Sequence, residues 1–306
     1  MNGNRALGAT ALSRREFLGR ATSTVAAGAL ASGRLAAGGA EQASVRWKMR
    51  LSGSSIAFTA LPIEKACQRL ASLGFEAVDV WSGHAGCPHL DDVLNRLGAD
   101  GLMQLLAKHK LKLYSFSVYA GGYRRYAELL GKCGGGVAVS GSAGPCDPKE
   151  LTSRMKAFIE QLKPEVELAE KYNSYLAIEN HGHALLDSVD SFKAFVDINK
   201  NPRLGIALAP YHVQALKAPV EEAIQAAGPA LLYFYAWQLA PGVGQLPGLG
   251  PTDFTPWLAA LAKVNYRWYV NPFLHGEPPP DETSKALAKS VAYLKACYEK
   301  GVGSTQ

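Results

Sequence analysis

Apolar positions follow two alternating periods along the chain from residue 47 onward. Short apolar runs, some alternating with polar residues, predict strands, and apolar residues spaced three and four apart predict helices between them. The predicted strands cover residues 47–58, 75–81, 112–119, 137–141, 174–180, 203–209, 231–237 and 268–273. The predicted helices cover residues 62–73, 91–111, 147–166, 188–199, 219–227, 254–264 and 283–299, and Pro164 is expected to kink or split the third.

These elements form about eight strand–helix units within residues 41–306. A (β/α)8 TIM barrel has this alternation over about 250 residues, so we predict an α/β protein with one such barrel and no internal domain boundary. The alternative is a doubly wound open sheet. It has less support, because no G-x-G-x-x-G motif follows the first strand and no break separates two halves.

The first forty residues have a different pattern, which is typical of an export signal. The segment S-R-R-E-F-L at residues 13–18 precedes a weakly apolar run, rich in Ala and Gly, at residues 21–31. Paired arginines before a mild apolar run are typical of a twin-arginine signal peptide. We therefore predict a signal over residues 1–40 and a periplasmic location. Small residues at 29–31 and at several later positions up to Ala40 fit the cleavage rule, so the cleavage position stays open.

The charge of the chain is concentrated in that predicted signal. The whole chain has 32 Lys and Arg against 26 Asp and Glu, a net +6, whereas residues 41–306 are near neutral at +2. No dense basic patch with interleaved aromatics remains, so we expect no nucleic-acid partner. A hydrophobic fraction of 48% excludes a disordered chain, and no apolar run reaches the roughly 20 residues of an integral membrane span.

The five cysteines are scattered along the chain and odd in number, and none forms a C-x-x-C pair. This spacing favours neither a zinc cluster nor a redox pair. We expect mostly buried or half-buried thiols, with at most one bridge, at Cys67, Cys87, Cys133, Cys146 and Cys297.

Polar and aromatic side chains gather where the predicted strands end. In a barrel these ends meet at one face, which carries the active site. Five of the chain's seven histidines follow predicted strands, so we expect them to converge on one mouth. The candidate site residues are Trp81, His84, Glu179, His181, His183, His212, Tyr235, Trp237, Asn271, His275 and Glu277.

Two of these segments resemble a known family. The runs A-I-E-N-H-G at residues 177–182 and G-F-E-A-V-D-V-W at residues 74–81 are similar to the xylose isomerase-like TIM barrels, from about Met49 to Tyr298. That family comprises sugar and sugar phosphate isomerases and epimerases, with a distant endonuclease branch. The resemblance implies one divalent metal held by Glu, Asp, His and Glu from strands five to eight, and two glutamates that move a proton next to a carbonyl.

Three of the four metal ligands that the resemblance implies are replaced in this chain. Glu179 matches the first glutamate, whereas Ala209, Tyr235 and Asn271 stand where Asp, His and Glu are expected. A methyl group, a neutral phenol and an amide are absent or weak ligands, so an Mn, Mg or Zn site is disfavoured and endonuclease activity is not expected. A rearranged site stays open, built from Glu179, His181, His212, His275 or Glu277.

The leading hypothesis is an exported isomerase, epimerase or related lyase acting on a small carbohydrate. Glu179 would be the general base next to a carbonyl, and His212 the acid or the oxygen-binding partner. Tyr235 and Asn271 would hydrogen-bond an enediolate oxygen in place of the metal. The alternative is a non-catalytic carbohydrate-binding barrel. Each residue also has a structural interpretation, for example Trp237 as a core aromatic or His183 as a brace of its strand.

Overall fold

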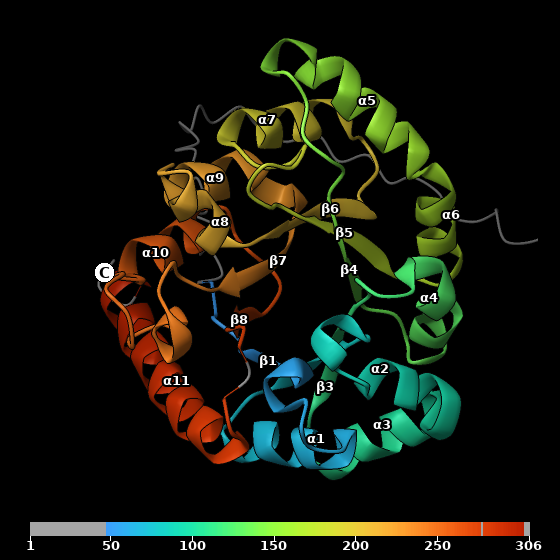
Figure 1. The fold of residues 1–306 in the computed structure, drawn as a ribbon, viewed down its shortest axis with the longest axis vertical. Coiled ribbons are helices and arrows are strands. Elements are labelled where there is room, and N and C mark those ends of the chain that lie inside the picture. The colour runs from blue at the N-terminus through green and yellow to red at the C-terminus, as the bar shows by residue number, and fades with distance from the viewer. Residues whose placement is uncertain (1–46, 277, 303–306) are drawn as a thin grey trace, which may run out of the picture. The chain divides into compact units, whose positions relative to one another are not determined.

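Eight parallel strands form a ring in the computed structural model, which describes residues 47–276 and 278–302 (Figure 1). Each strand pairs with its neighbours in sequence order, and a bridge between Leu51 and Val270 joins the last strand to the start of the first. The predicted (β/α)8 barrel is therefore confirmed. The strands are β1 (Ser52–Ser54), β2 (Ala77–Trp81), β3 (Lys112–Ser117), β4 (Val137–Gly141), β5 (Tyr175–Glu179), β6 (Leu204–Leu208), β7 (Leu231–Ala236) and β8 (Val270–Pro272).

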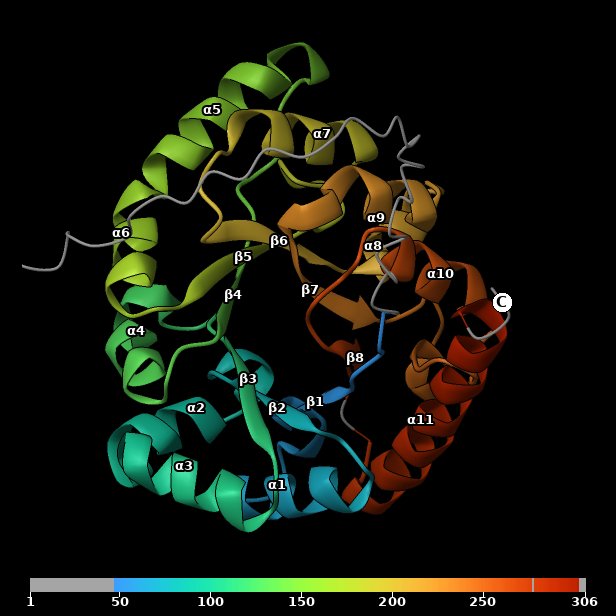
Figure 2. The same cartoon turned by 180° about the vertical axis from the view of Figure 1, so that it is seen from behind.

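Helices surround the strands on the outside of the ring (Figures 1 and 2). They are α1 (Ile63–Ser72), α2 (His89–Asp92), α3 (Gly98–Lys108), α4 (Gly122–Lys132), α5 (Leu151–Gln161), α6 (Lys163–Lys171), α7 (Val189–Ile198), α8 (Pro210–Ala215), α9 (Val220–Ala227), α10 (Thr255–Lys263) and α11 (Pro280–Val302). The chain divides between α5 and α6, one residue before Lys163-Pro164, as the proline predicts. The predicted helix 91–111 is wrong as one element, because a wider π-helical turn at Val93–Leu97 separates α2 from α3. Helices α4 and α8 were not predicted.

Large apolar residues alternate with small residues along β6, and this alternation shows how the sequence forms the barrel. Leu204, Ile206 and Leu208 point outward into the layer under the helices, whereas the residues between them are small. A Cβ at Gly205 would lie 2.5 Å from Leu232 Cγ and nearer still to the carbonyl oxygen of Ala230. Glycine is therefore required by the close approach of β7, and β6 stays tightly paired with it.

A buried carboxyl group, that of Asp79, organises the barrel interior. Five side chains donate hydrogen bonds to it: Ser54, Trp81, Ser115, Ser117 and Tyr233. Burial raises the pKa of Asp79, and the hydrogen bonds from the three serines and Trp81 oppose that rise. A register shift between β2 and β3 after Val78 places Asp79 opposite Ser115. Asp79 thereby fixes the ring of Trp81, which stands at the end of β2.

All five cysteines are free thiols in this structure; Cys146 is half-buried and the other four are buried. In the part of the chain that the structure describes, every helix is too short or too polar to cross a membrane. The predicted signal at residues 1–40 and the candidate residue Glu277 lie outside the described residues.

Candidate active site

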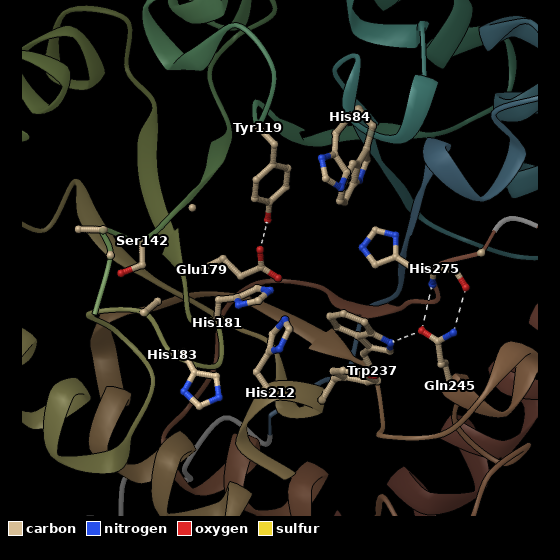
Figure 3. A pocket seen from close by; sticks show the side chains of 17 residues that line it. His84, Tyr119, Ser142, Glu179, His181, His183, His212, Trp237, Gln245 and His275 are labelled. Carbon is tan, nitrogen blue, oxygen red and sulfur yellow. Dashed lines mark hydrogen bonds between the residues drawn. The ribbon is translucent and has the colours of Figure 1, made fainter. Parts of the chain in front are cut away.

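A cavity of about 740 Å³ lies at the carboxyl ends of the strands (Figure 3). Its walls come from segments that follow seven of the eight strands, which is where barrel enzymes carry their chemistry. The volume is in the range of small-molecule pockets. The lining residues are Trp81, His84, Tyr119, Gly141, Ser142, Ala143, Gly144, Glu179, His181, His183, Ala184, Tyr211, His212, Trp237, Gln245, His275 and Gly276.

Glu179 is the acidic side chain of this lining, and it is held by a tyrosine. The Tyr119 hydroxyl donates to Glu179 Oε2 at 2.6 Å (Figure 3). It also lies 3.1 Å from the Tyr235 hydroxyl. Burial raises the pKa of Glu179 from 4.5 to about 7; the Tyr119 hydrogen bond lowers it, and the charge of Asp79 raises it further. The carboxyl can therefore accept and return a proton near neutral pH.

His212 lies in the first turn of α8 and lines the same cavity as Glu179. Its ring is buried, and it lies 3.9 Å from the ring of His181 between centroids. Burial, followed by the neighbouring His181 and His275, lowers the pKa of His212 to about 3. At neutral pH His212 is an uncharged imidazole. It can hydrogen-bond a ligand oxygen, and it is not poised as an imidazolium acid.

Aromatic rings form much of the wall. Tyr211 stacks on Trp237 with centroids 4.3 Å apart, and Trp81 stacks on Phe273 at 5.4 Å. The Tyr119 ring lies 5.1 Å from that of Trp81. Flat apolar rings beside hydrogen-bonding groups suit the alternating apolar faces and hydroxyl groups of a sugar ring.

Gln245 ties two of the loops together. Its Oε1 accepts from Trp237 Nε1 at 2.8 Å and from the His275 backbone N–H at 3.1 Å. Its Nε2 donates to the carbonyl oxygens of His275 at 2.9 Å and Gly242 at 3.1 Å. The amide thus uses both acceptor and both donor positions, and it links the loops after β7 and β8 into one wall (Figure 3).

No lysine or arginine is among the described residues that line the cavity. Its polar character comes from Glu179, histidines, hydroxyl groups and the Gln245 amide. The described wall therefore offers hydrogen bonds without a fixed positive charge that would favour a phosphate group.

The structure brings together eight of the candidate residues at this cavity: Trp81, His84, Glu179, His181, His183, His212, Trp237 and His275. Tyr235 is fully buried behind Tyr119 and reaches the site through its hydroxyl group. The placement predicted for Asn271 is wrong, because it does not line the cavity. Its fully buried amide donates to Ser52 at 3.0 Å and lies 3.1 Å from the Ser54 hydroxyl, whose proton goes to Asp79, one layer deeper in the barrel.

Four lining residues with polar side chains were not among the candidates: Tyr119, Ser142, Tyr211 and Gln245. Tyr119 and Ser142 follow the ends of β3 and β4, so the strand-end criterion applied to those two strands finds both. Tyr211 is next to His212. Gln245 lies in a Gly- and Pro-rich loop, and no sequence pattern indicates its position.

The fold and this site define a (β/α)8 barrel with a carboxyl group positioned for acid–base chemistry in a polar and aromatic cavity. A family model described as "Xylose isomerase-like TIM barrel" matches residues 67–297. The chain belongs to this family, as the sequence motifs indicated. A search of curated protein sequences gave no significant match.

Solved structures with this fold include several sugar epimerases. A 3-keto-D-glucoside 4-epimerase from E. coli in the apo form is 16% identical, with a TM-score of 0.63 over 82% of this chain and 100% of that chain. A D-tagatose 3-epimerase-like protein is 16% identical, with a TM-score of 0.66 over 84% of this chain and 100% of that one. The IOLI protein with a bound zinc atom is 15% identical, with a TM-score of 0.64 over 82% and 99%. At these identities the likeness establishes the fold.

The side chains at the three altered positions do not fit the metal site that the family resemblance implies. Ala209 is fully buried and has no donor atom, the Tyr235 hydroxyl is bonded to Tyr119, and the Asn271 amide is bonded to Ser52. Within residues 47–276 and 278–302, no three His, Cys, Asp or Glu side chains gather closely enough to hold a metal ion. Glu179 alone keeps its expected type, and it is bonded to Tyr119.

Proposed function

We propose that this protein is an exported enzyme that isomerises or epimerises a carbohydrate by moving a proton next to a carbonyl group. The observation that carries the proposal is Glu179, a cavity-lining carboxyl group whose pKa is raised to about 7. A base of this pKa takes a carbon-bound proton and returns it at neutral pH. The family and the sugar epimerases among its structural neighbours support the same class of reaction.

Each part of the wall has a task in this reaction. Glu179 accepts the proton from the carbon next to the carbonyl. His212, as a neutral imidazole, hydrogen-bonds a hydroxyl or carbonyl oxygen of the sugar. The stacked Tyr211 and Trp237 hold one face of the ring and exclude water from the reacting atoms. The isomer forms when Glu179 returns the proton to the neighbouring carbon on the same face. The epimer forms when the enediol first turns its other face to Glu179.

An unphosphorylated sugar fits this site best. No lysine or arginine is found among the described lining residues, and the twin-arginine pattern at residues 13–18 favours a location outside the pool of intracellular sugar phosphates. Export is tested by replacing Arg14 and Arg15 together with lysine and fractionating the cells. We expect the wild type in the periplasm and the variant in the cytoplasm; an unchanged distribution would contradict export by this route.

Deuterium incorporation from D2O tests the reaction itself. D-fructose, D-tagatose and D-allulose are incubated with the wild type, with Glu179→Gln and with the control Glu222→Gln, an exposed glutamate on α9. We expect exchange with at least one sugar, its loss in Glu179→Gln, and wild-type exchange in the control. Sugar binding, followed by tryptophan fluorescence, should persist in Glu179→Gln. Equal exchange by wild type and Glu179→Gln would refute the role of Glu179.

The second candidate function is carbohydrate binding without catalysis. It is favoured by the three altered ligand positions, whose side chains are either inert or engaged in internal hydrogen bonds. This function predicts saturable quenching of tryptophan fluorescence by a sugar, with no deuterium exchange on any member of the panel.

A further inference from the structure

Tyr119 lies between Glu179, which is the proposed catalytic base, and the interior of the barrel. Its hydroxyl lies 2.6 Å from Glu179 Oε2 and 3.1 Å from the Tyr235 hydroxyl. The side chain of Tyr119 lines the cavity, whereas Tyr235 is fully buried behind it. Since Tyr119 donates to the carboxylate, its oxygen accepts from Tyr235. The order of donation is therefore Tyr235 to Tyr119 to Glu179.

One member of this hydroxyl chain of Tyr235 and Tyr119 is at a position where the family resemblance implies a metal ligand. Tyr235 replaces the expected histidine, and its oxygen reaches the Tyr119 oxygen. Tyr119 stays protonated, because burial and then the charge of Glu179 raise its pKa well above 10. The site therefore holds a base and a neutral proton donor in contact with each other and in the same cavity wall.

We propose that Tyr119 is the catalytic acid partner of Glu179, and that this pair moves a proton between a sugar carbon and its carbonyl oxygen without a divalent metal. The inference rests on the proposed isomerase or epimerase function and adds the donor that the reaction needs. Tyr235 is a positioning residue, whose hydroxyl holds the Tyr119 oxygen and stabilises negative charge on it.

The step balances with these two side chains. Glu179 takes the proton from the carbon next to the carbonyl, and the electron pair of that C–H bond forms the C=C bond of an enediol. The C=O π pair moves to oxygen, which takes the Tyr119 hydroxyl proton. The Glu179 carboxyl then returns its proton to the Tyr119 phenolate along their 2.6 Å hydrogen bond. Both side chains are restored at the enediol. The same transfers in reverse at the neighbouring carbon and its hydroxyl group, with Glu179 returning a proton to carbon, then give the isomer, and no oxidant, reductant or further reactant is consumed.

Exchange rates with and without metal test this pair. The wild type is treated with EDTA and dialysed, and deuterium incorporation into D-fructose, D-tagatose and D-allulose is measured with and without added Mn²⁺. We expect equal rates in both conditions. Tyr119→Phe should lower kcat by about 10²- to 10⁴-fold with a change in KM of only a few fold, because a general acid contributes on that scale. Tyr235→Phe should lower kcat by about tenfold, a loss on the scale of one hydrogen bond.

Tyr172→Phe is the matched control, since Tyr172 lies on the outer helix layer after α6, where its ring packs beside Lys171. It should exchange at the wild-type rate. If Tyr119→Phe fails to fold, 3,5-difluorotyrosine placed at position 119 keeps the shape and lowers the phenol pKa. Its exchange rate should differ from wild type by several fold, and an unchanged rate would overturn the proposal.

The possible failures are distinguishable. Loss of exchange in EDTA with recovery in Mn²⁺ would overturn the metal-free pair and leave the isomerase function standing. Wild-type exchange by Tyr119→Phe would overturn the role of Tyr119 and also leave that function standing. No exchange by the wild type on any sugar would overturn the proposed function and this inference together.

Discussion

The raised pKa of Glu179 predicts that this residue opposes folding at the pH at which it works. Its carboxyl has a pKa of about 7 in the folded protein against 4.5 as a reference for the unfolded chain. Between these two values the folded state binds the proton more readily than the unfolded state. The free energy of unfolding therefore falls as the pH rises through this window.

The magnitude follows from the shift. Each pKa unit corresponds to about 1.4 kcal/mol, so the complete shift corresponds to about 3 kcal/mol above pH 7. Glutamine cannot ionise, and its amide oxygen still accepts from Tyr119. We expect Glu179→Gln to gain about 3 kcal/mol relative to wild type between about pH 4.5 and about pH 8. In a chain of this size that gain corresponds to a Tm higher by about 6–12 °C.

Urea unfolding at several pH values, followed by circular dichroism, measures the difference between the two proteins. All other titrating groups are shared and largely cancel. Glu222→Gln serves again as the control, because this exposed side chain should leave the wild-type pH dependence almost unchanged. A difference between Glu179→Gln and wild type that does not vary with pH would refute the reasoning, since it would mean that the Glu179 carboxylate is well solvated.

Three further predictions concern the scaffold of the site. Gly205→Ala should lower the free energy of unfolding by about 3 kcal/mol, because its Cβ meets the Ala230 carbonyl; a Tm within 2 °C of wild type, about 1 kcal/mol or less, would contradict this. Asp79→Ala should cost about 3–5 kcal/mol, because it leaves five buried donors without an acceptor, and Asp79→Asn should cost less in the same urea titration. Equal losses in the two variants would argue against the hydrogen bonds as the cause. Gln245→Ala should weaken sugar binding about tenfold by calorimetry, since the His275 loop loses its anchor; an unchanged Kd would contradict that.

The architecture was predictable because its signals are local. Each strand is a short apolar run and each polar cluster follows directly, so the barrel and eight of the lining residues follow from periodicity and strand ends. Helix α4 also carries such a signal: Tyr123, Tyr126, Ala127 and Leu130 are buried at helical spacing. The sequence after the third strand therefore contains enough local pattern to predict this helix.

The depth of a side chain inside the barrel was not predictable in the same way. Asn271 and Glu179 both stand near strand ends, but the stagger between strands sets one below the cavity and the other at its wall. The hydroxyl chain from Tyr235 through Tyr119 joins residues 116 positions apart, and Gln245 reaches His275 across two loops. Such contacts depend on the closed three-dimensional ring, and no local pattern encodes them.

The lack of lysine and arginine among the described wall residues of the cavity has a kinetic consequence. A phosphate-binding site draws its ligand by long-range attraction, and the association rate then falls steeply as ionic strength rises. This cavity binds a neutral sugar through aromatic rings, hydroxyl groups and an uncharged imidazole. Long-range electrostatic attraction therefore contributes little to the association rate, and salt has little to screen. For the exported role proposed above, capture of the sugar should proceed at nearly the same rate in dilute and in salty surroundings.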